Sequence, residues 1–218
     1  MPPLTHPTTP EHPAESPGVV IGNHTQKYTA RNPAIRWLTG RWVARLRAAL
    51  DAVAAQAPAG ATALEVGCGE GVISHYLADR FGQVTALDLP DAGLREQWRT
   101  RPGPHYLHAD AHRLPFRDRQ FDVVVAAEVL EHLPDPERGF AELLRVSRGH
   151  LVLSVPREPI FRLGNLAAGR YVRDWGNTPG HLNHWSTRGF RRFVAEAAQV
   201  RAVATPLPWT IVWASRRP

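Results

Sequence analysis

Three alternate glycines that follow a short apolar run constrain this chain more than any other feature of its sequence. The run from Ala63 to Val66 is followed by Gly67, Gly69 and Gly71. Glycine lets the backbone turn tightly and approach a ligand where a Cβ would collide. A helix that begins beyond such a loop offers unpaired N–H groups to a carboxylate or a phosphate. The segment therefore predicts a strand, a ligand-binding loop and a helix, in that order.

The spacing of these glycines differs from that of a dinucleotide fingerprint. That fingerprint has glycine at its first, third and sixth positions, but the sixth position counted from Gly67 is Val72. The pattern is instead an acidic residue, Glu65, followed by three alternate glycines. A nicotinamide-dependent dehydrogenase is therefore a distant alternative.

Short apolar runs alternate with helical segments after residue 60, which is typical of βαβ units and a parallel sheet. The run Val123 to Val125 has no polar alternation, as expected of a central strand that is covered on both faces. We expect a doubly wound, mostly parallel α/β sheet of seven strands. The expected strands are 62–66, 84–88, 105–108, 122–126 and 151–155, and two more between 200 and 215, where Pro206 and Pro208 intervene.

Helix signals surround this core. Asn32 as N-cap and Pro33 open an amphipathic helix, Asp135 and Pro136 open a second, and Ser186 caps a third. Trp185 precedes that cap and is placed to pack on Phe190 as a hydrophobic staple. The first helix has an apolar face with Ile35, Leu38, Trp42, Leu50 and Val53, and a face expected to be solvated with Arg36, Arg41, Arg45 and Arg47.

The chain divides into a tail and one domain. Residues 1–22 contain six prolines among polar residues, so we expect a disordered tail followed by a domain over 23–218. About thirty residues after the fifth strand, 156–185, have the position of a substrate-covering insertion, and we interpret them as a lid.

Composition narrows the class of protein and the compartment in which it is expected. Cys68 is the single cysteine, so a disulfide framework and a cysteine-based zinc cluster are excluded, and a reducing compartment fits. No apolar stretch is long enough to span a bilayer and no signal peptide is visible, so a cytoplasmic protein is expected. The net charge of +6 comes from an arginine excess, which reflects codon bias as readily as a basic binding surface.

With its glycine loop, the chain resembles the class I S-adenosylmethionine-dependent methyltransferases over roughly residues 60 to 155. The resemblance implies a Rossmann-like fold and S-adenosylmethionine as cofactor. It places Gly67, Cys68, Gly69 and Gly71 against the methionine part of the cofactor, with Glu65 helping to hold the amino group.

Two later segments match the same family. By resemblance, Asp88 at the end of the second strand binds both ribose hydroxyls, and a carboxylate suits a diol because it accepts two hydrogen bonds side by side. Leu89 lies against the adenine, Asp110 accepts from the adenine amino group, and Ala111 supplies a backbone N–H to the ring. Each aspartate taken alone is also an ordinary turn-capping residue.

By resemblance, the segment from Ala126 to Leu133 at the end of the fourth strand holds the groups nearest the reactive methyl group, and Glu128 in it is a candidate cofactor-binding residue. A hydroxyl or amine acceptor needs a base, and the candidates are His132, His181 and His184, because imidazole titrates near neutral pH. His132 is equally consistent with a structural histidine at a helix start. Tyr28 is a candidate to close over the cofactor from the other side.

These observations favour a methyltransferase that acts on O, N or C of a small molecule, with no metal and no nucleic-acid partner. The Asn/Asp-Pro-Pro-aromatic motif of base-amino methyltransferases is absent, and Cys68 lies in the cofactor loop, not where cytosine C5 chemistry needs a nucleophile.

Two alternatives remain open. Glu128, Glu131 and His132 with a later His181 or His184 resemble the metal ligands of small-RNA 2′-O-methyltransferases, in which a divalent ion activates a ribose diol. Strongly salt-dependent RNA binding would favour that function. The other alternative is a catalytically silent partner subunit, which is distinguished by whether the cofactor binds to this chain alone.

Overall fold

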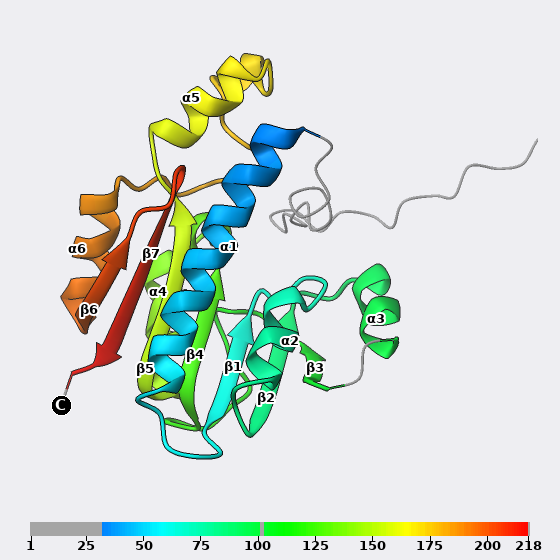
Figure 1. Ribbon diagram of the computed structural model, residues 1–218, viewed down its shortest axis with the longest axis vertical. Helices are drawn as coiled ribbons and strands as arrows, with labels where there is room; N and C mark the ends of the chain where they lie inside the picture. The colour runs from blue at the N-terminus through cyan, green and yellow to red at the C-terminus, as the bar shows by residue number, and fades with distance from the viewer. Residues whose placement is uncertain (1–31, 101–102, 218) are drawn as a thin grey trace, which may run out of the picture.

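A computed structural model describes residues 32–100 and 103–217 of the chain. Within these residues the chain forms one seven-stranded sheet with helices on both faces (Figure 1). The strands are β1 (Thr62–Val66), β2 (Gln83–Asp88), β3 (His105–His108), β4 (Phe121–Ala127), β5 (Ser147–Pro156), β6 (Ala198–Ala204) and β7 (Trp209–Arg216).

The strand order is β3-β2-β1-β4-β5-β7-β6. Strands β1 to β5 are parallel, whereas β7 runs antiparallel to both β5 and β6. The prediction of a mostly parallel, doubly wound seven-stranded sheet is thus confirmed. From β1 the chain builds outward through β2 and β3 and then returns to the other side of β1 with β4, so the winding reverses between β1 and β4. In open α/β sheets, ligands bind outside the carboxyl ends of the strands at such a reversal.

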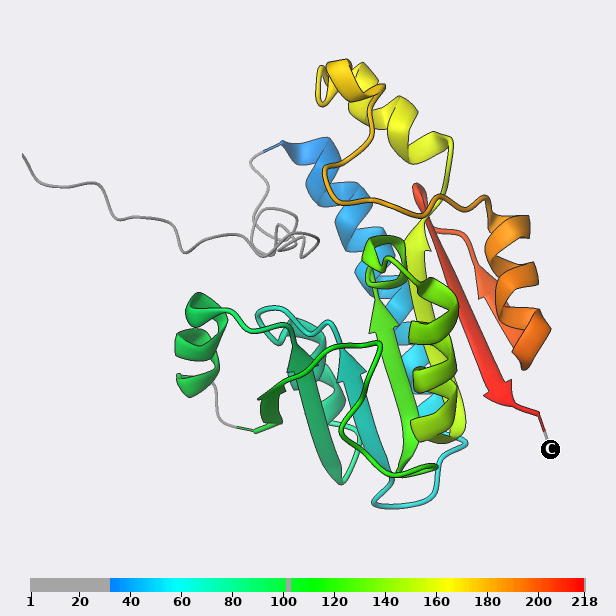
Figure 2. The same ribbon diagram turned by 180° about the vertical axis from the view of Figure 1, so that it is seen from behind.

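Two helices cover each face. Figure 1 shows α1 and α2 in front of the sheet, and Figure 2 shows α4 and α6 on the opposite side. The helices are α1 (Pro33–Ala54), α2 (Val72–Ala78), α3 (Ala92–Arg99), α4 (Pro136–Val146), α5 (Ile160–Ala167) and α6 (Thr187–Ala197), with short 3-10 helices η1 (Leu130–His132) and η2 (Val172–Asp174).

The predicted caps are confirmed. The side chain of Asn32 accepts a hydrogen bond from the N–H of Ala34 at the start of α1. Asp135 and Ser186 cap α4 and α6 in the same way. The rings of Trp185 and Phe190 are 5.5 Å apart between centroids, as a hydrophobic staple requires.

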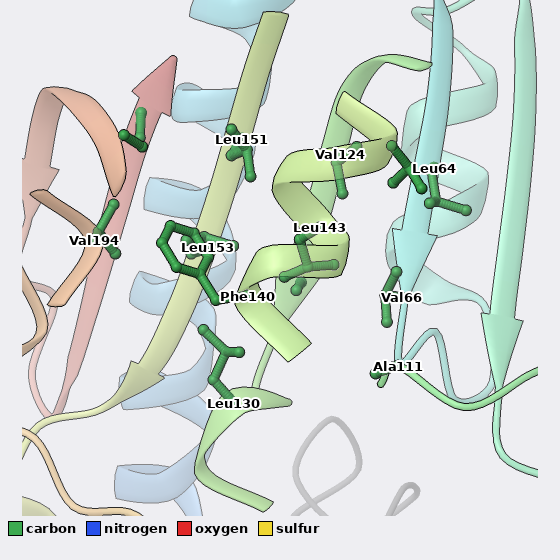
Figure 3. Close-up of a cluster of buried hydrophobic side chains, with 14 of the residues drawn as sticks. Leu64, Val66, Ala111, Val124, Leu130, Phe140, Leu143, Leu151, Leu153 and Val194 are labelled. Atoms are coloured by element: carbon green, nitrogen blue, oxygen red, sulfur yellow. The ribbon is translucent and has the colours of Figure 1, made fainter. Parts of the chain in front are cut away.

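The central strand β4 has side chains in both halves of the core, as its unbroken apolar run predicts. Val124 packs with α4 and α6, whereas Val123 and Val125 pack with α1 and α2. Figure 3 shows the first of these halves, where Phe140 and Leu143 of α4 lie over the sheet. Because side chains alternate across a strand, each face of β4 requires its own apolar cover.

Helix α1 lies on the sheet through a row of side chains spaced three or four residues apart: Trp42, Leu46, Leu50 and Val53, none more than 1% exposed. The arginine face is solvated as predicted, since Arg36, Arg41, Arg45 and Arg47 are all exposed. Ile35 and Leu38, expected on the buried face, are only partly buried near the start of the helix.

The lid begins one residue later than predicted, because β5 continues through Pro156. It contains α5 and η2 and ends at Trp185, which forms an isolated parallel bridge with Arg157. The two ends of the lid are therefore joined at its base. The predicted tail, residues 1–22, lies outside the described residues.

Among the described residues, no helix combines the length and the apolar character needed to cross a membrane.

Asp122 ties the amino ends of β1 and β4 together. Its Oδ2 accepts from the N–H of Thr62 at 2.8 Å, and its Oδ1 accepts from Nη1 of Arg148 at 2.6 Å. Burial raises the pKa of Asp122, but the bonds from Thr62 and Arg148 together outweigh it and hold the pKa below its ordinary value of 3.8. The folded state therefore favours the ionised carboxyl, and this stabilisation is present above the unfolded pKa.

We expect Asp122→Asn to lower the free energy of unfolding at neutral pH by about 1 to 3 kcal/mol. The deficit should shrink as the pH falls through 3.8 towards the folded pKa, where the wild type also loses the charge. Urea unfolding over a pH series measures both effects. Asp118→Asn is the control, because this exposed partner of Arg145 should change little. A deficit that grows on acidification would contradict the assignment.

Candidate active site

The glycine loop leaves β1 at the reversal point of the sheet and enters α2. Gly67, Gly69 and Gly71 have φ values of +73°, +50° and +80°, which is the left-handed region that disfavours other residues. Gly71 is the N-cap of α2 and makes no side-chain cap, so helix N–H groups face the loop. The predicted strand–loop–helix unit is therefore present.

Hydrogen bonds fix this loop to the neighbouring strand. The N–H groups of Gly67 and Cys68 both donate to the carbonyl of Leu87, at 2.8 and 3.0 Å. The carbonyl of Gly69 accepts from the indole N–H of Trp98 at 2.8 Å, which adds a tether to α3. Strand β2 and helix α3 thus both hold the loop in place.

Asp88 ends β2 beside the loop. Its Oδ2 accepts from the N–H of Gly69 at 2.7 Å, and its Oδ1 accepts from the N–H of Leu89 at 2.8 Å. Each carboxylate oxygen accepts more than one hydrogen bond, so these two bonds leave capacity for a diol. Asp88 is partly buried at the loop, and its remaining acceptor capacity fits the ribose hydroxyls of the expected cofactor.

Glu65 lies in β1 and is only 2% exposed. It accepts a hydrogen bond from the hydroxyl of Ser74, so β1 and the first turns of α2 are joined through a carboxylate. The thiol of Cys68 is also buried, and burial raises its pKa, with further increases from the charges of Glu65 and Asp88. A thiol held neutral in this way is no nucleophile.

Asp110 and Ala111 follow β3. Oδ1 of Asp110 accepts from the N–H of His112 at 2.8 Å and contacts the Nδ1 of the same histidine at 2.7 Å. Burial raises the pKa of Asp110, but these interactions with His112 prevail and lower it. Ala111 is buried at the end of the sheet, near Val66 (Figure 3). The turn-capping role of Asp110 is therefore observed, and its predicted contact with adenine stays a prediction.

Glu128 follows β4 with a φ of +65°, an unusual conformation for a non-glycine residue and one that costs energy. Its carboxylate accepts from the indole of Trp209 at 2.6 Å and from the hydroxyl of Ser154 at 3.2 Å. That hydroxyl also accepts from the indole of Trp42 at 2.8 Å. The strained residue is thus fixed by α1, β5 and β7, three elements that the sequence analysis did not connect with it.

The next turn brings a carboxylate and two imidazoles together. One ligand atom from each of Glu131, His132 and His181 lies within 4.8 Å of the others, and Glu131 and His181 are buried. The cluster adjoins the glycine loop through Val129, because a Cβ on Gly67 would lie 2.3 Å from Cγ2 of Val129. The acidic–imidazole cluster and the cofactor loop are therefore close neighbours.

Main-chain bonds and the side chain of Asn183 fasten the lid over this turn. The carbonyl of Glu131 accepts from the N–H groups of Leu182 and Asn183 at 2.8 and 3.0 Å. The side-chain amide of Asn183 donates to the carbonyls of Leu130 and Leu133 at 3.1 and 2.7 Å. These bonds bring His181 to Glu131 from fifty residues further along the chain.

His132 is oriented by the lid. Its Nδ1 lies 2.9 Å from the carbonyl of Gly180. Because a carbonyl only accepts, Nδ1 must donate, and in the neutral ring the lone pair is therefore on Nε2. This arrangement suits either a base or a metal ligand.

The structure does not bring every predicted residue into the cluster. His184 is exposed, and its Nε2 contacts the amide oxygen of Asn177 at 2.8 Å instead. Glu128 is engaged with Trp209 and Ser154, apart from the group formed by Glu131 and the two histidines. Tyr28 lies outside the described residues.

A row of aromatic rings connects Glu128 with the cluster. Neighbouring ring centroids are 4.9 to 6.0 Å apart, a range in which aromatic side chains attract one another. The row runs Trp42, Trp209, Phe161, His181, His132. Sequence analysis did not bring the first three together at the site, since the contacts join α1, β7 and the lid and leave no local pattern.

Comparison with known proteins finds relatives of the segment that carries the glycine loop, Asp88 and Glu131. Residues 64–153 match the family described as a methyltransferase domain. The chain is 35% identical over 138 residues to the demethylmenaquinone methyltransferase of Renibacterium salmoninarum, covering 62% of this chain and 56% of that protein. It is 36% identical over 110 residues to a malonyl-(acyl-carrier protein) O-methyltransferase of Enterobacter lignolyticus, covering 50% of this chain and 44% of that protein.

The matches thus span about half the length of these two relatives. A solved structure of magnesium protoporphyrin IX methyltransferase from Synechocystis PCC 6803 with bound SAH has the same fold, with a TM-score of 0.62 and 18% identity. The alignment covers 85% of this chain and 88% of that one.

The contact between Gly67 and Val129 gives a test of how the two halves of the site are joined. Gly67→Ala should cost about 1 kcal/mol for the left-handed backbone and a further 1 to 3 kcal/mol, roughly, for the collision with Val129. Gly60→Ala is the matched control, since Gly60 has a φ of +74° and no atom within 4 Å of an added Cβ. Urea unfolding measures both.

In a double-mutant cycle, Val129→Ala should remove the additional cost of Gly67→Ala. Equal costs for the two glycine variants would show that the loop does not depend on the approach of Val129.

Proposed function

Because residues 64–153 form a methyltransferase domain of the class I S-adenosylmethionine-dependent family, we propose that this chain methylates a small-molecule acceptor. The observation that carries the proposal is the direct packing of Val129 against Gly67. It joins a loop whose chemistry fits the cofactor to a carboxylate–imidazole cluster whose chemistry fits an acceptor. When bound, the cofactor supplies an electrophilic methyl group on a sulfonium.

Residues of the chain have two tasks in such a transfer. Methyl transfer from a sulfonium loses charge, so alignment of the acceptor and exclusion of water matter more than stabilisation of new charge. The glycine loop and Asp88 would hold the cofactor, and Asp110, Ala111 and Leu89 would hold its adenine. The lid, fastened to Glu131 by backbone bonds, would cover the acceptor.

His132 is our choice for the base. Its Nδ1 donates to Gly180, so Nε2 takes the proton that a hydroxyl or amine acceptor loses as it is methylated. The carboxylate of Glu131 lies beside it and would stabilise an imidazolium formed at His132. His181 is a positioning residue in this proposal, and His184 has no role in it.

The aromatic row supports a small and partly apolar acceptor. Rings of Trp209, Phe161 and His181 lie between the carboxylate of Glu128 and the base, and small-molecule sites combine such apolar walls with few polar groups. The two relatives compared above are named for a quinone-type and an acyl-carrier acceptor. An O, N or C atom of such a molecule is the proposed methylation site.

Asp88→Ala should weaken binding of S-adenosylhomocysteine by about 1 to 3 kcal/mol, roughly a five- to 150-fold higher Kd, because cofactor hydroxyls lose their acceptor. Isothermal titration calorimetry of the full chain measures this, with NADH as a ligand that should give no heat. Asp118→Ala, a surface aspartate 76% exposed, is the charge-matched control and should bind normally. A folded wild type that binds no S-adenosylhomocysteine would refute the proposal and favour a silent partner subunit.

Metal-assisted transfer is the second candidate, favoured by the grouping of Glu131, His132 and His181. Three protein ligands leave coordination positions open, as catalytic metal sites require. The set differs from the one expected from sequence, since Glu128 and His184 lie elsewhere.

Our proposal predicts that removal of divalent ions leaves the protein unchanged. After treatment with a chelator, calorimetric titration with Zn²⁺, Mn²⁺ or Mg²⁺ should give no binding that Glu131→Gln abolishes, and S-adenosylhomocysteine should bind as before. Divalent binding that is lost in Glu131→Gln but kept in His184→Ala would establish the metal site and promote the RNA-type alternative.

A further inference from the structure

The lid carries most of the large apolar side chains that are exposed among the described residues. Seven large apolar side chains are exposed in residues 32–100 and 103–217, and their exposed fractions range from 37% for Ile160 to 78% for Trp175. Five of them belong to the lid: Ile160, Leu163, Val172, Trp175 and Leu182. Single exposed apolar residues are ordinary, but their concentration in one segment marks a binding surface.

Helix α5 shows that this surface has no role in the core. None of the residues 160–167 is buried. Phe161 points back to the body of the protein, where its ring lies 6.0 Å from Trp209 and 5.6 Å from His181. Leu163, on a different side of the same short helix, is 58% exposed. The helix therefore presents apolar side chains in two directions, and only one is used within the domain.

The beginning of α1 adds to this surface. Figures 1 and 2 both show α5 and the loop after it beside the first turns of α1, at the end of the molecule where the strands β4 and β5 terminate. Trp37 lies in these turns and is 59% exposed. We call the six residues Trp37, Ile160, Leu163, Val172, Trp175 and Leu182 the lid surface.

Arginines accompany these side chains. Arg170 and Arg173 are exposed in the lid, and Arg36 and Arg41 are exposed on α1. The guanidinium of Arg41 lies 4.9 Å from the centre of the Trp37 ring, a cation–π distance. The lid, residues 157–185, contains four arginines and two acidic residues, so the segment has a net positive charge.

Exposed tryptophan, aliphatic side chains and arginine together have the composition of a segment that lies in a membrane interface. Tryptophan rings settle at the level of the headgroups, aliphatic side chains enter the acyl boundary, and arginines pair with anionic lipids. A protein partner would bury the apolar residues equally well but gives no reason for the arginine excess around them. We propose that the lid surface docks on the interface of an anionic lipid bilayer.

Docking at this place would have a consequence for the site. The same segment supplies Phe161 and His181 to the aromatic row and the cluster, so its inner side faces the proposed acceptor position. An acceptor that resides in the bilayer would then enter beneath the lid. The docking itself needs neither cofactor nor catalysis, so it is tested independently of the proposed function.

The test is vesicle flotation of the full chain. The wild type should float with vesicles of phosphatidylcholine and phosphatidylglycerol in equal parts. Less of it should float with vesicles of phosphatidylcholine alone, and high salt should reduce flotation with the anionic vesicles. The variant Leu163→Glu/Trp175→Glu should bind the anionic vesicles at least about tenfold more weakly, because two exposed apolar groups that would enter the bilayer are replaced by charges that anionic lipids repel.

The control variant, Gln56→Glu/Gln83→Glu, adds the same two charges at exposed positions near the amino ends of β1 and β2. It should float like the wild type. Unchanged S-adenosylhomocysteine binding in the lid variant shows that the fold is intact, and flotation by a chain that binds no S-adenosylhomocysteine would leave docking standing without the proposed function.

Three results would overturn the proposal. The first is a wild type that does not float with anionic vesicles. The second is a lid variant that floats as well as the wild type. In the third, light scattering shows a wild-type dimer that the lid variant abolishes, which would assign the surface to contacts between copies of the chain.

Discussion

The reversal of strand order between β1 and β4 is the constraint on which the site depends. Parallel strands end at the same edge of a sheet, so the loop at Gly67, the carboxylate of Asp88 and the turn at Glu128 arrive together from well-separated parts of the sequence. The reversal also keeps the segments that follow β1 and β4 from covering one another. Hydrogen bonds then fix the detail: Asp88 accepts from Gly69, and Val129 packs directly on Gly67. The loop proposed to hold the cofactor and the cluster proposed to receive the acceptor thereby share one boundary.

The proposed acceptor half is held by main-chain bonds and by one side-chain amide. One carbonyl, that of Glu131, receives two lid N–H groups, and the amide of Asn183 binds two further carbonyls of the same turn. Each such bond contributes about 1 kcal/mol, and together they fix His181 beside His132. Because the bonds to Glu131 join main-chain atoms, side-chain changes in the lid leave them in place, whereas a change at Asn183 removes the other two. Such a lid tolerates variation of its surface while the cluster beneath it stays formed.

The sequence predicted what local chemistry decides. Strand and helix alternation, the glycine loop, Asp88 at a strand end and the caps at Asn32 and Ser186 are each encoded within a few residues, and the structure confirms them as structural features. Local chemistry could not predict whether His181 or His184 joins the cluster with Glu131. Both lie in one short segment, and the turn at Gly180 together with the contacts of Asn177 and Asn183 decides which ring points inward. The engagement of Glu128 by Trp209 was equally hidden, because it depends on the antiparallel return of β7 beside β5.

The lid has an inner and an outer apolar side, and one fastening to Glu131 holds both in place. Phe161 and His181 face the aromatic row, whereas Leu163 and Trp175 face solvent. Any displacement of the segment that breaks the bonds to Glu131 would move both sides at once. A surface that binds the outer side in one lid position must therefore shift the population in which His181 meets Glu131. Linkage is reciprocal, so whatever occupies the inner side must alter affinity for that surface by the same free energy. Binding at the outer side of the lid and activation of an acceptor at its inner side would then depend on the same conformational equilibrium of the lid.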